Sequence, residues 1–240
     1  MNTIWTGHGY TDTGSVRTLN EDCVLTRCEH SLWAVADGMG GHNNGDYASQ
    51  HVIGGLADYH FSPLRGISVS RIRSLLFNSN IHLINKARKE QADVIGCTVA
   101  ALSIHGNVAL CSWSGDSRIY RVRRGRLNQL TRDHSQQSLA EDSNPIDSAD
   151  ISVPNGQMLT CAIGGERDIR VEHCLYELLR LDRFLICTDG LYKEICAEEI
   201  LDIALGNISP ESFIDSIATL YTDRGARDNI GMVYIKSAEV

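Results

Sequence analysis

Several features that are absent from the sequence narrow the classes of protein to which it can belong. No apolar run approaches the length of a membrane-spanning helix, and the N-terminal residues contain neither the basic nor the apolar segment of a secretory signal. Only 4 prolines occur in 240 residues, and neither a Pro/Gly/Ser-rich linker nor an internal repeat divides the chain. We therefore expect one domain over residues 1–240, in the cytoplasm and without a membrane attachment.

Cysteine pairs at metal-binding spacing are also missing. The 8 cysteines are scattered singly, and none forms a CxxC pair. Cys97, Cys111, Cys161 and Cys187 lie inside apolar runs, which is typical of small core residues in a reducing compartment. The pattern argues against both a zinc site and a disulfide framework.

The sequence also lacks an excess of basic residues. The 22 Lys and Arg are outnumbered by 30 Asp and Glu, so the formal net charge at pH 7 is −8. A nucleic acid would be repelled by this charge. We therefore expect no nucleic-acid partner, and carboxylates that are available to bind cations.

Apolar periodicity predicts a mixture of helices and short strands. Helical spacing predicts helices over 46–59, 70–90 and 197–205, and another from Ser209, with Pro210 at its first position. Runs bounded by turn residues predict the strands 20–26, 31–36, 97–104, 108–113, 118–123, 127–130, 157–163, 171–178, 183–188 and 230–235. The four strands from 97 to 130 are expected to form one antiparallel meander. These elements indicate an α+β fold.

The stretch Asp133–Asn155 has no periodicity. It is acidic and includes Pro145 and Pro154. A long unstructured stretch inside a compact domain is unusual and is often a functional surface loop. We expect such a loop here.

An acid follows several of the predicted strands. Asp37-Gly38 ends the apolar run Leu32–Ala36, and such a pair alone is an ordinary turn. The chain repeats the arrangement, however, with acids at the edges of strands: Glu21-Asp22, Asp37-Gly38, Gly115-Asp116, Asp189-Gly190 and Asp228-Asn229. Strand ends meet at the rim of a sheet, so several of these acids are expected to converge.

Converging carboxylates repel one another unless they take up protons or bind cations. An all-oxygen set without Cys or His at ligand spacing selects Mg²⁺ or Mn²⁺ over zinc. Two such ions activate water beside a phosphoryl group. Arg17 precedes Glu21 and is suited to bind a phosphate bidentately, although the alternative for a lone arginine is a surface charge.

In this order, the acids and their neighbours resemble the metal-dependent protein serine/threonine phosphatases of the PP2C (PPM) family, in their bacterial single-domain form. The resemblance covers nearly the whole chain and rests on the blocks 14–22 (GSVRTLNED), 35–42 (VADGMGGH), 96–98 (GCT), 115–120 (GDSRIY), 130–135 (LTRDHS), 185–191 (LICTDGL) and 227–230 (RDNI). It implies a four-layer α-β-β-α sandwich of two antiparallel sheets flanked by helices. It also implies a centre of two Mn²⁺ or Mg²⁺ ions at one rim.

The resemblance further implies a role for each acid. Asp37 would bridge the two ions, and the carbonyl of Gly38 would complete the ligands of one of them. Asp189 and Asp228 would bind the other ion. Glu21 or Asp22 would act directly or through water.

The remaining implied roles concern the substrate and a third ion. Arg17 would bind the substrate phosphate and, with Asp37, Asp189 and Asp228, make up the catalytic set. Asp116 together with Asp189 would form a weaker third metal site, as in bacterial members.

The sequence departs from the family pattern at four places, two of which are Gly231 instead of a usual threonine and Asp46 instead of a usual glutamate. Met39 stands where animal members carry a histidine thought to protonate the leaving oxygen, and bacterial relatives share the methionine. His42 and His134 are nearby candidates for a general acid, with a structural histidine as the alternative for each. The loop at about 133–155 matches the family's flap only at its start, so substrate preference does not carry over.

The resemblance implies hydrolysis of phosphoserine and phosphothreonine by direct attack of a hydroxide bound to two metal ions. The alternatives are a non-catalytic regulatory module on the same fold and a hydrolase of small phosphoesters. The expected partners are a phosphorylated protein and the bacterial Ser/Thr kinase that the phosphatase opposes, with type VI secretion as one setting. The chain is expected to be a monomer.

Overall fold

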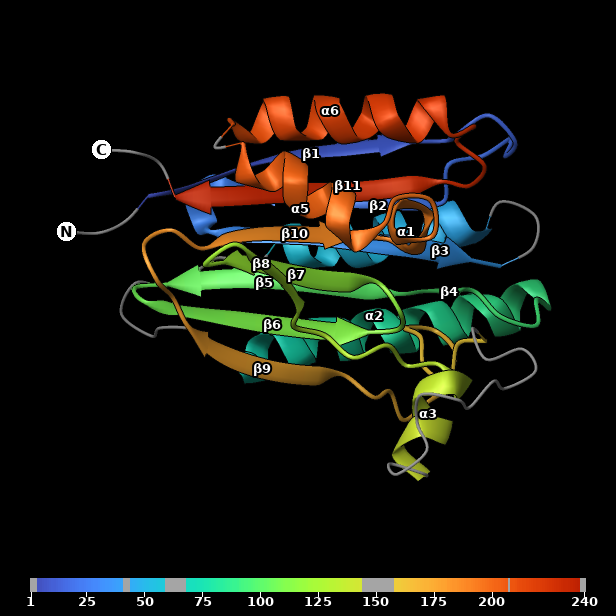
Figure 1. Ribbon diagram of the computed structural model, residues 1–240. Helices are drawn as coiled ribbons and strands as arrows, with labels where there is room; N and C mark the ends of the chain where they lie inside the picture. The colour runs from blue at the N-terminus through green and yellow to red at the C-terminus, as the bar shows by residue number, and fades with distance from the viewer. Residues whose placement is uncertain (1–3, 41–43, 59–67, 144–157, 207, 238–240) are drawn as a thin grey trace.

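The computed structural model describes residues 4–40, 44–58, 68–143, 158–206 and 208–237, with residues 141–143 described by their backbone alone. Two antiparallel sheets lie face to face, and helices lie outside them (Figure 1). This arrangement confirms the predicted four-layer α-β-β-α sandwich. Among the described helices, none is long and apolar enough to cross a membrane.

The first sheet has five strands in the order β1-β11-β10-β7-β8. Their bounds are β1 (Trp5–Asp12), β7 (Arg118–Arg123), β8 (Arg126–Gln129), β10 (Arg183–Cys187) and β11 (Ile230–Ser237). The helices on its outer side are α4 (Asp189–Tyr192), α5 (Ala197–Leu205) and α6 (Pro210–Asp223), whose buried residues share one apolar cluster with β7, β10 and β11.

The second sheet has the order β2-β3-β5-β6-β9, with β4 paired to β3. Its bounds are β2 (Asp22–Arg27), β3 (Leu32–Met39), β4 (Gly96–Cys97), β5 (Val99–His105), β6 (Val108–Ser114) and β9 (Glu172–Glu177), and the single turn η1 (Cys28–His30) links β2 to β3. The helices α1 (Asn44–Ala57) and α2 (Val69–Glu90) share an apolar cluster with this sheet.

The core between the two sheets fixes their relative position. Trp33, Phe184 and Val233 come from three strands of both sheets and are fully buried there. Burial of each such side chain contributes roughly 1.5–3 kcal/mol. The helices have local signals as well: the Ser209 hydroxyl accepts a hydrogen bond from the backbone N–H of Ser212, and Pro210 occupies the first position of α6.

The predicted four-stranded meander over residues 97–130 is wrong. β5 and β6 pair in the second sheet, whereas β7 and β8 belong to the first, where β7 pairs with β10. The chain crosses from one sheet to the other at Gly115, whose φ of +107° is in the region that favours glycine. A Cβ at this position would lie 2.7 Å from Cβ of Thr98. Turn sequences mark the strand ends but do not reveal the neighbour of each strand.

One predicted strand and the predicted loop also need correction, and one strand was missed. The strand expected over 157–163 is not one, because Leu159 and Ile163 each form only an isolated bridge. β1 was not predicted from the sequence. It lies at the edge of its sheet, and Trp5 is its only buried residue, so the strand shows no alternation of apolar and polar residues. The loop expected over 133–155 contains the helix α3 (Gln136–Ser143), and its residues 144–155 lie outside the described residues.

Candidate active site

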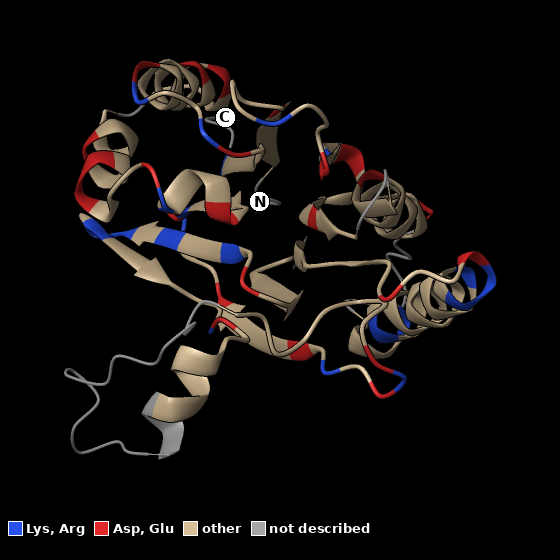
Figure 2. Cartoon of the chain, turned by 90° about the vertical axis from the view of Figure 1, so that its right-hand side faces the viewer, with Lys and Arg blue, Asp and Glu red and all other residues tan. Residues whose placement is uncertain are grey.

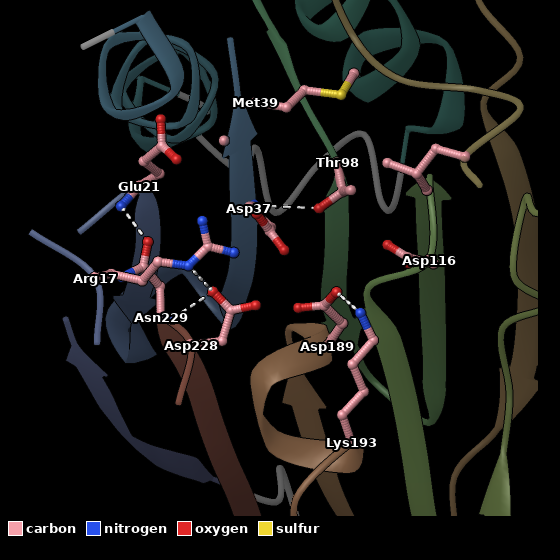
Figure 3. Close-up of a pocket in the computed structure, with 12 residues that line it drawn as sticks. Arg17, Glu21, Asp37, Met39, Thr98, Asp116, Asp189, Lys193, Asp228 and Asn229 are labelled. Carbon is pink, nitrogen blue, oxygen red and sulfur yellow. Dashed lines mark hydrogen bonds and ion pairs between the residues drawn. The ribbon is translucent and has the colours of Figure 1, made fainter. Parts of the chain in front are cut away.

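Carboxylates from both sheets meet in one pocket at the rim where β3 and β10 end. The pocket has a volume of about 220 Å³ and is lined by Arg17, Glu21, Asp37, Gly38, Met39, Thr98, Asp116, Leu159, Asp189, Lys193, Asp228 and Asn229 (Figure 3). Figure 2 looks onto this end of the sandwich and shows acidic positions on several strand ends and helix starts. The fold therefore brings together residues that are far apart in the sequence.

Asp37 lies near the end of β3 and projects into the middle of the pocket (Figure 3). Its backbone N–H donates to Oγ1 of Thr98 at 3.1 Å, which fixes this strand end against the start of β5. Gly38 follows, and a Cβ there would lie 2.0 Å from the carbonyl oxygen of Gly45 at the start of α1. Only glycine allows this approach, so the carbonyl of residue 38 stays at the pocket wall.

The two acids that precede and begin β2 occupy different environments. Asp22 pairs in register with Asp37, is 6% exposed and lies beneath the pocket rather than in its lining. Its Oδ2 accepts a hydrogen bond from Oγ1 of Thr188 at 2.7 Å. Its buried Oδ1 has no hydrogen-bond partner among the described residues. Glu21, by contrast, lines the pocket, and its Oε1 lies so close to Gly45 that a Cβ there would be 2.1 Å away.

Arg17 faces the acids from the loop between β1 and β2. Its Nε donates to Oδ1 of Asp228 at 2.8 Å, and Figure 3 shows its terminal nitrogens directed toward Asp37. Asn229 holds this loop, because its side-chain amide donates to the carbonyl oxygens of Thr13 and Leu19, both at 2.8 Å. The guanidinium therefore stands on a braced loop beside the carboxylates.

The opposite wall contains a second cation. Lys193 Nζ lies 2.5 Å from Oδ2 of Asp189, on the side of the pocket that Asp116 also lines (Figure 3). Asp189 begins α4, directly after β10, and Lys193 is the C-cap of the same short helix. Its ammonium group thus reaches back over one helical turn to the acid that begins the helix.

Burial and mutual repulsion raise the pKa values of several of these acids. Burial, followed by the charges of Asp189 and Asp228, raises the pKa of Asp22 to about 8, although the Thr188 hydroxyl opposes the rise. Burial and the neighbouring acids also raise the pKa of Asp37 well above its ordinary value. Burial raises the pKa of Asp116 to about 6. Such a group of carboxylates is stabilised either by protons or by cations.

The donor set fits a hard divalent cation. It consists of carboxylates and a peptide carbonyl, and the buried Oδ1 of Asp22 lacks a partner among the residues that the structure describes. Within that same part of the chain, however, no three Asp, Glu, His or Cys side chains form a ready-made metal-binding group. Two of the acids are instead bonded to Arg17 and Lys193.

The structure gathers most of the predicted site residues. All of them except the buried Asp22 line the pocket, and so does Met39. His134 does not belong to the lining: its Nδ1 accepts the backbone N–H of Gly115 at 3.2 Å, and burial lowers its pKa, as for a structural histidine. His42 lies outside the described residues.

Four of the pocket residues had no role assigned from the sequence, namely Thr98, Leu159, Lys193 and Asn229. Lys193 is four residues after Asp189, a spacing that pairs charges on a helix, but the helix was expected to begin only at residue 197. Thr98 was quoted in a motif without a role, although its hydroxyl accepts the backbone N–H of Asp37. The Thr98 contact joins segments far apart in the sequence, and Lys193 was missed because the short helix α4 was not predicted.

Known proteins with this arrangement are found by sequence and by structure. The family model described as protein phosphatase 2C matches residues 15–229. Serine/threonine protein phosphatase PstP of Mycobacterium tuberculosis is 32% identical over 193 residues, or 80% of this chain and 37% of that protein. The chain thus spans little more than a third of that relative's length.

Solved structures superpose on nearly the whole chain. "PppA, a key regulatory component of T6SS in Pseudomonas aeruginosa" has a TM-score of 0.89 and 32% identity, covering 99% of both chains. The catalytic domain of PstP in complex with 2 manganese ions has a TM-score of 0.85 and 27% identity, covering 99% of this chain and 100% of that one. With its acids gathered at the rim of this sandwich and a family match from residue 15 to residue 229, the chain belongs to the protein phosphatase 2C family.

Proposed function

We propose that this protein hydrolyses phosphoserine and phosphothreonine in proteins, with two Mn²⁺ or Mg²⁺ ions held at the pocket. The observation that carries the proposal is that Asp37, Asp189 and Asp228, from separate segments of the chain, line one pocket with Arg17. The manganese in the PstP catalytic domain supports the choice of metal.

The charges of the site support two divalent ions. Six carboxyl groups oppose two cationic side chains: Glu21, Asp22, Asp37, Asp116, Asp189 and Asp228 against Arg17 and Lys193. When all are ionised, the excess of four negative charges would repel a phosphate group. Two divalent ions carry the charge that neutralises this excess.

The proposed ligand roles are those that the family resemblance implies, and the presence of these residues in one pocket supports them. Asp37, in the middle of the pocket, would hold both ions, and the Gly38 carbonyl would hold one of them. Asp189 and Asp228 would hold the other ion. Glu21 or Asp22 would act directly or through water, and Asp22 lies beside Asp37 in the register of β2 and β3. When bound, the ions supply an activated water and stabilise charge on the phosphoryl oxygens.

The chain's own residues position the substrate. The Arg17 guanidinium binds the phosphate oxygens bidentately through the nitrogens that face the pocket. Asn229 holds the loop that carries Arg17, and Thr98 holds the strand end that carries Asp37. Met39 lines the pocket without a titratable proton, so the leaving oxygen draws its proton from another group.

We also propose that residues 1–240 form one phosphatase domain whose flap-like segment at about 133–155 selects the substrate. α3 projects from the end of the sandwich that carries the pocket (Figures 1 and 2), and Ser135 just before α3 forms a bridge with the pocket residue Leu159. The similarity to PppA, described as a key regulatory component of T6SS, supports a role in type VI secretion. Opposition to a Ser/Thr kinase stays a prediction. The cytoplasmic location and the monomeric state stay predictions.

Purified protein tests the activity. We expect Mn²⁺-dependent hydrolysis of p-nitrophenyl phosphate and of a phosphothreonine peptide, lost in EDTA and reduced at least ~100-fold by Asp37→Ala. Asp215→Asn, which removes an exposed acid on α6, is the matched control and should retain full activity. Metal-replete protein that turns over neither substrate would refute the proposal. Faster turnover of small metabolites than of phosphopeptides would favour the small-phosphoester alternative.

A further inference from the structure

Lys193 is an unusual component of a site that collects cations, because it brings a positive charge of its own. Its ammonium nitrogen lies 2.5 Å from Oδ2 of Asp189, and both residues line the pocket with Asp116. Figure 3 shows the side chain extended along the pocket wall so that only its end meets the acid. The ammonium thus occupies a place where a bound cation would contact the same carboxylate.

The position of Lys193 is fixed by its neighbour in the chain. The Tyr192 hydroxyl donates to the carbonyl oxygen of Asp116 at 3.1 Å, and the guanidinium of Arg118 lies 3.5 Å from the centre of the Tyr192 ring. Arg118 is in turn bonded to the Asp133 carboxylate, at 2.7 Å for the closest pair of atoms. These contacts fix the end of α4 against the loop that contains Asp116.

The charge of Lys193 acts on both acids of this wall. Burial and the charges of Asp189 and Asp133 raise the pKa of Asp116, and Lys193 acts against them. Burial would lower the pKa of Lys193, but its bond to Asp189 and the charges of Asp189, Asp116 and Asp228 outweigh it and raise that pKa. By its position, 2.5 Å from Asp189 on the wall that Asp116 also lines, the ammonium is a counter-ion for this pair of carboxylates.

We propose that the Lys193 ammonium takes the place of a third divalent ion between Asp116 and Asp189, so that the chain binds two ions at this rim. The inference rests on the proposed function, since it presupposes the two-ion centre. A third ion would have to displace the ammonium or lie beside it, against the repulsion of like charges. A tethered ammonium also has a high effective concentration compared with a weakly held free ion.

The charge of the whole site agrees with this assignment. With Lys193 and Arg17 present, two divalent ions neutralise the six carboxylates, and a third would leave the site positive. Removing the lysine charge restores an excess negative charge next to Asp116 and Asp189. The position between Asp116 and Asp189 should then bind a divalent ion.

Counting bound ions tests the inference. The metal-free protein is titrated with Mn²⁺, and bound ions are counted by isothermal titration calorimetry and by the loss of the free-Mn²⁺ electron paramagnetic resonance signal. We expect two ions for the wild type and three for Lys193→Met, which keeps an unbranched apolar stem without the charge. Lys193→Arg should again bind two, and the double variant Lys193→Met/Asp116→Asn should lose the third.

Circular dichroism checks that Lys193→Met is folded. A second variant gives a test that does not depend on the folding of Lys193→Met. Asp116→Asn in the wild-type background should leave the count at two, whereas loss of an ion would overturn the inference. A wild type with three ions, or a folded Lys193→Met with two, would overturn it as well. In those cases continued hydrolysis of the phosphothreonine peptide leaves the proposed function standing. A protein that binds no Mn²⁺ and hydrolyses no peptide overturns both.

Discussion

Neutralising Asp116 should stabilise the metal-free protein. The side chain is 9% exposed, and burial with the charges of Asp189 and Asp133 raises its pKa from 3.8 to about 6. Each unit of pKa corresponds to roughly 1.4 kcal/mol, so the charged form costs the folded state about 3 kcal/mol. Asp116→Asn removes the charge and keeps the shape.

The sign of the pH dependence follows from the direction of the pKa shift. Because the folded state holds the proton more tightly than the unfolded state, the stability contributed by Asp116 is fully present below pH 3.8 and is lost as the pH rises to about 6. The asparagine side chain in Asp116→Asn does not titrate, so the variant does not lose stability in this pH range. The gain in unfolding free energy from Asp116→Asn should therefore be about 3 kcal/mol at pH 8, about half of that at pH 5, and close to zero below pH 4.

Urea unfolding in EDTA, followed by circular dichroism at pH 8 and pH 5, measures this gain. Asp215→Asn, on the exposed face of α6, is the matched control and should change the unfolding free energy by less than about 0.5 kcal/mol at either pH. A destabilised Asp116→Asn, or a gain that is the same at both pH values, would refute the reasoning from burial and repulsion.

Three further predictions concern other parts of the structure. Arg17→Ala should lower kcat/KM for a phosphothreonine peptide roughly 10- to 100-fold through loss of a charged hydrogen bond to phosphate, with partial recovery in Arg17→Lys; unchanged steady-state kinetics would contradict the assigned role. Arg123→Ala leaves the buried Asp182 carboxylate, 1% exposed, without its cation. The variant should lower the unfolding free energy, measured by urea titration, by about 3–5 kcal/mol. The control Arg126→Ala, at an exposed position of β8, should show no such loss. Gly115→Ala places a Cβ against Thr98 at a φ of +107° and should cost about 1–3 kcal/mol, measured by thermal unfolding; a neutral effect would show that the crossing between the sheets tolerates a side chain.

Local sequence patterns were sufficient to predict the helices whose formation depends on residues close together in the sequence. Helical periodicity located α2 and α5 closely, and the Ser209-Pro210 signal located the start of α6. These predictions succeeded because capping and one-sided burial act within a few turns. β1, with a single buried tryptophan and a place at the sheet edge, offered no comparable signal.

The sequence by itself determined which residues are available for chemistry: acids at strand ends, an arginine before Glu21, and glycines such as Gly38 where the backbone must pass closely. The tertiary structure decided which of them meet. Strand pairing joins distant segments, so it placed β7 in the opposite sheet from β6 and Asp22 beneath the pocket. The same packing brought α4, with its local pair of Asp189 and Lys193, to the wall that Asp116 lines. Composition and spacing encode local preference, whereas the charge balance of the pocket depends on long-range packing, and this is why the lysine in the cation site became visible only in the folded chain.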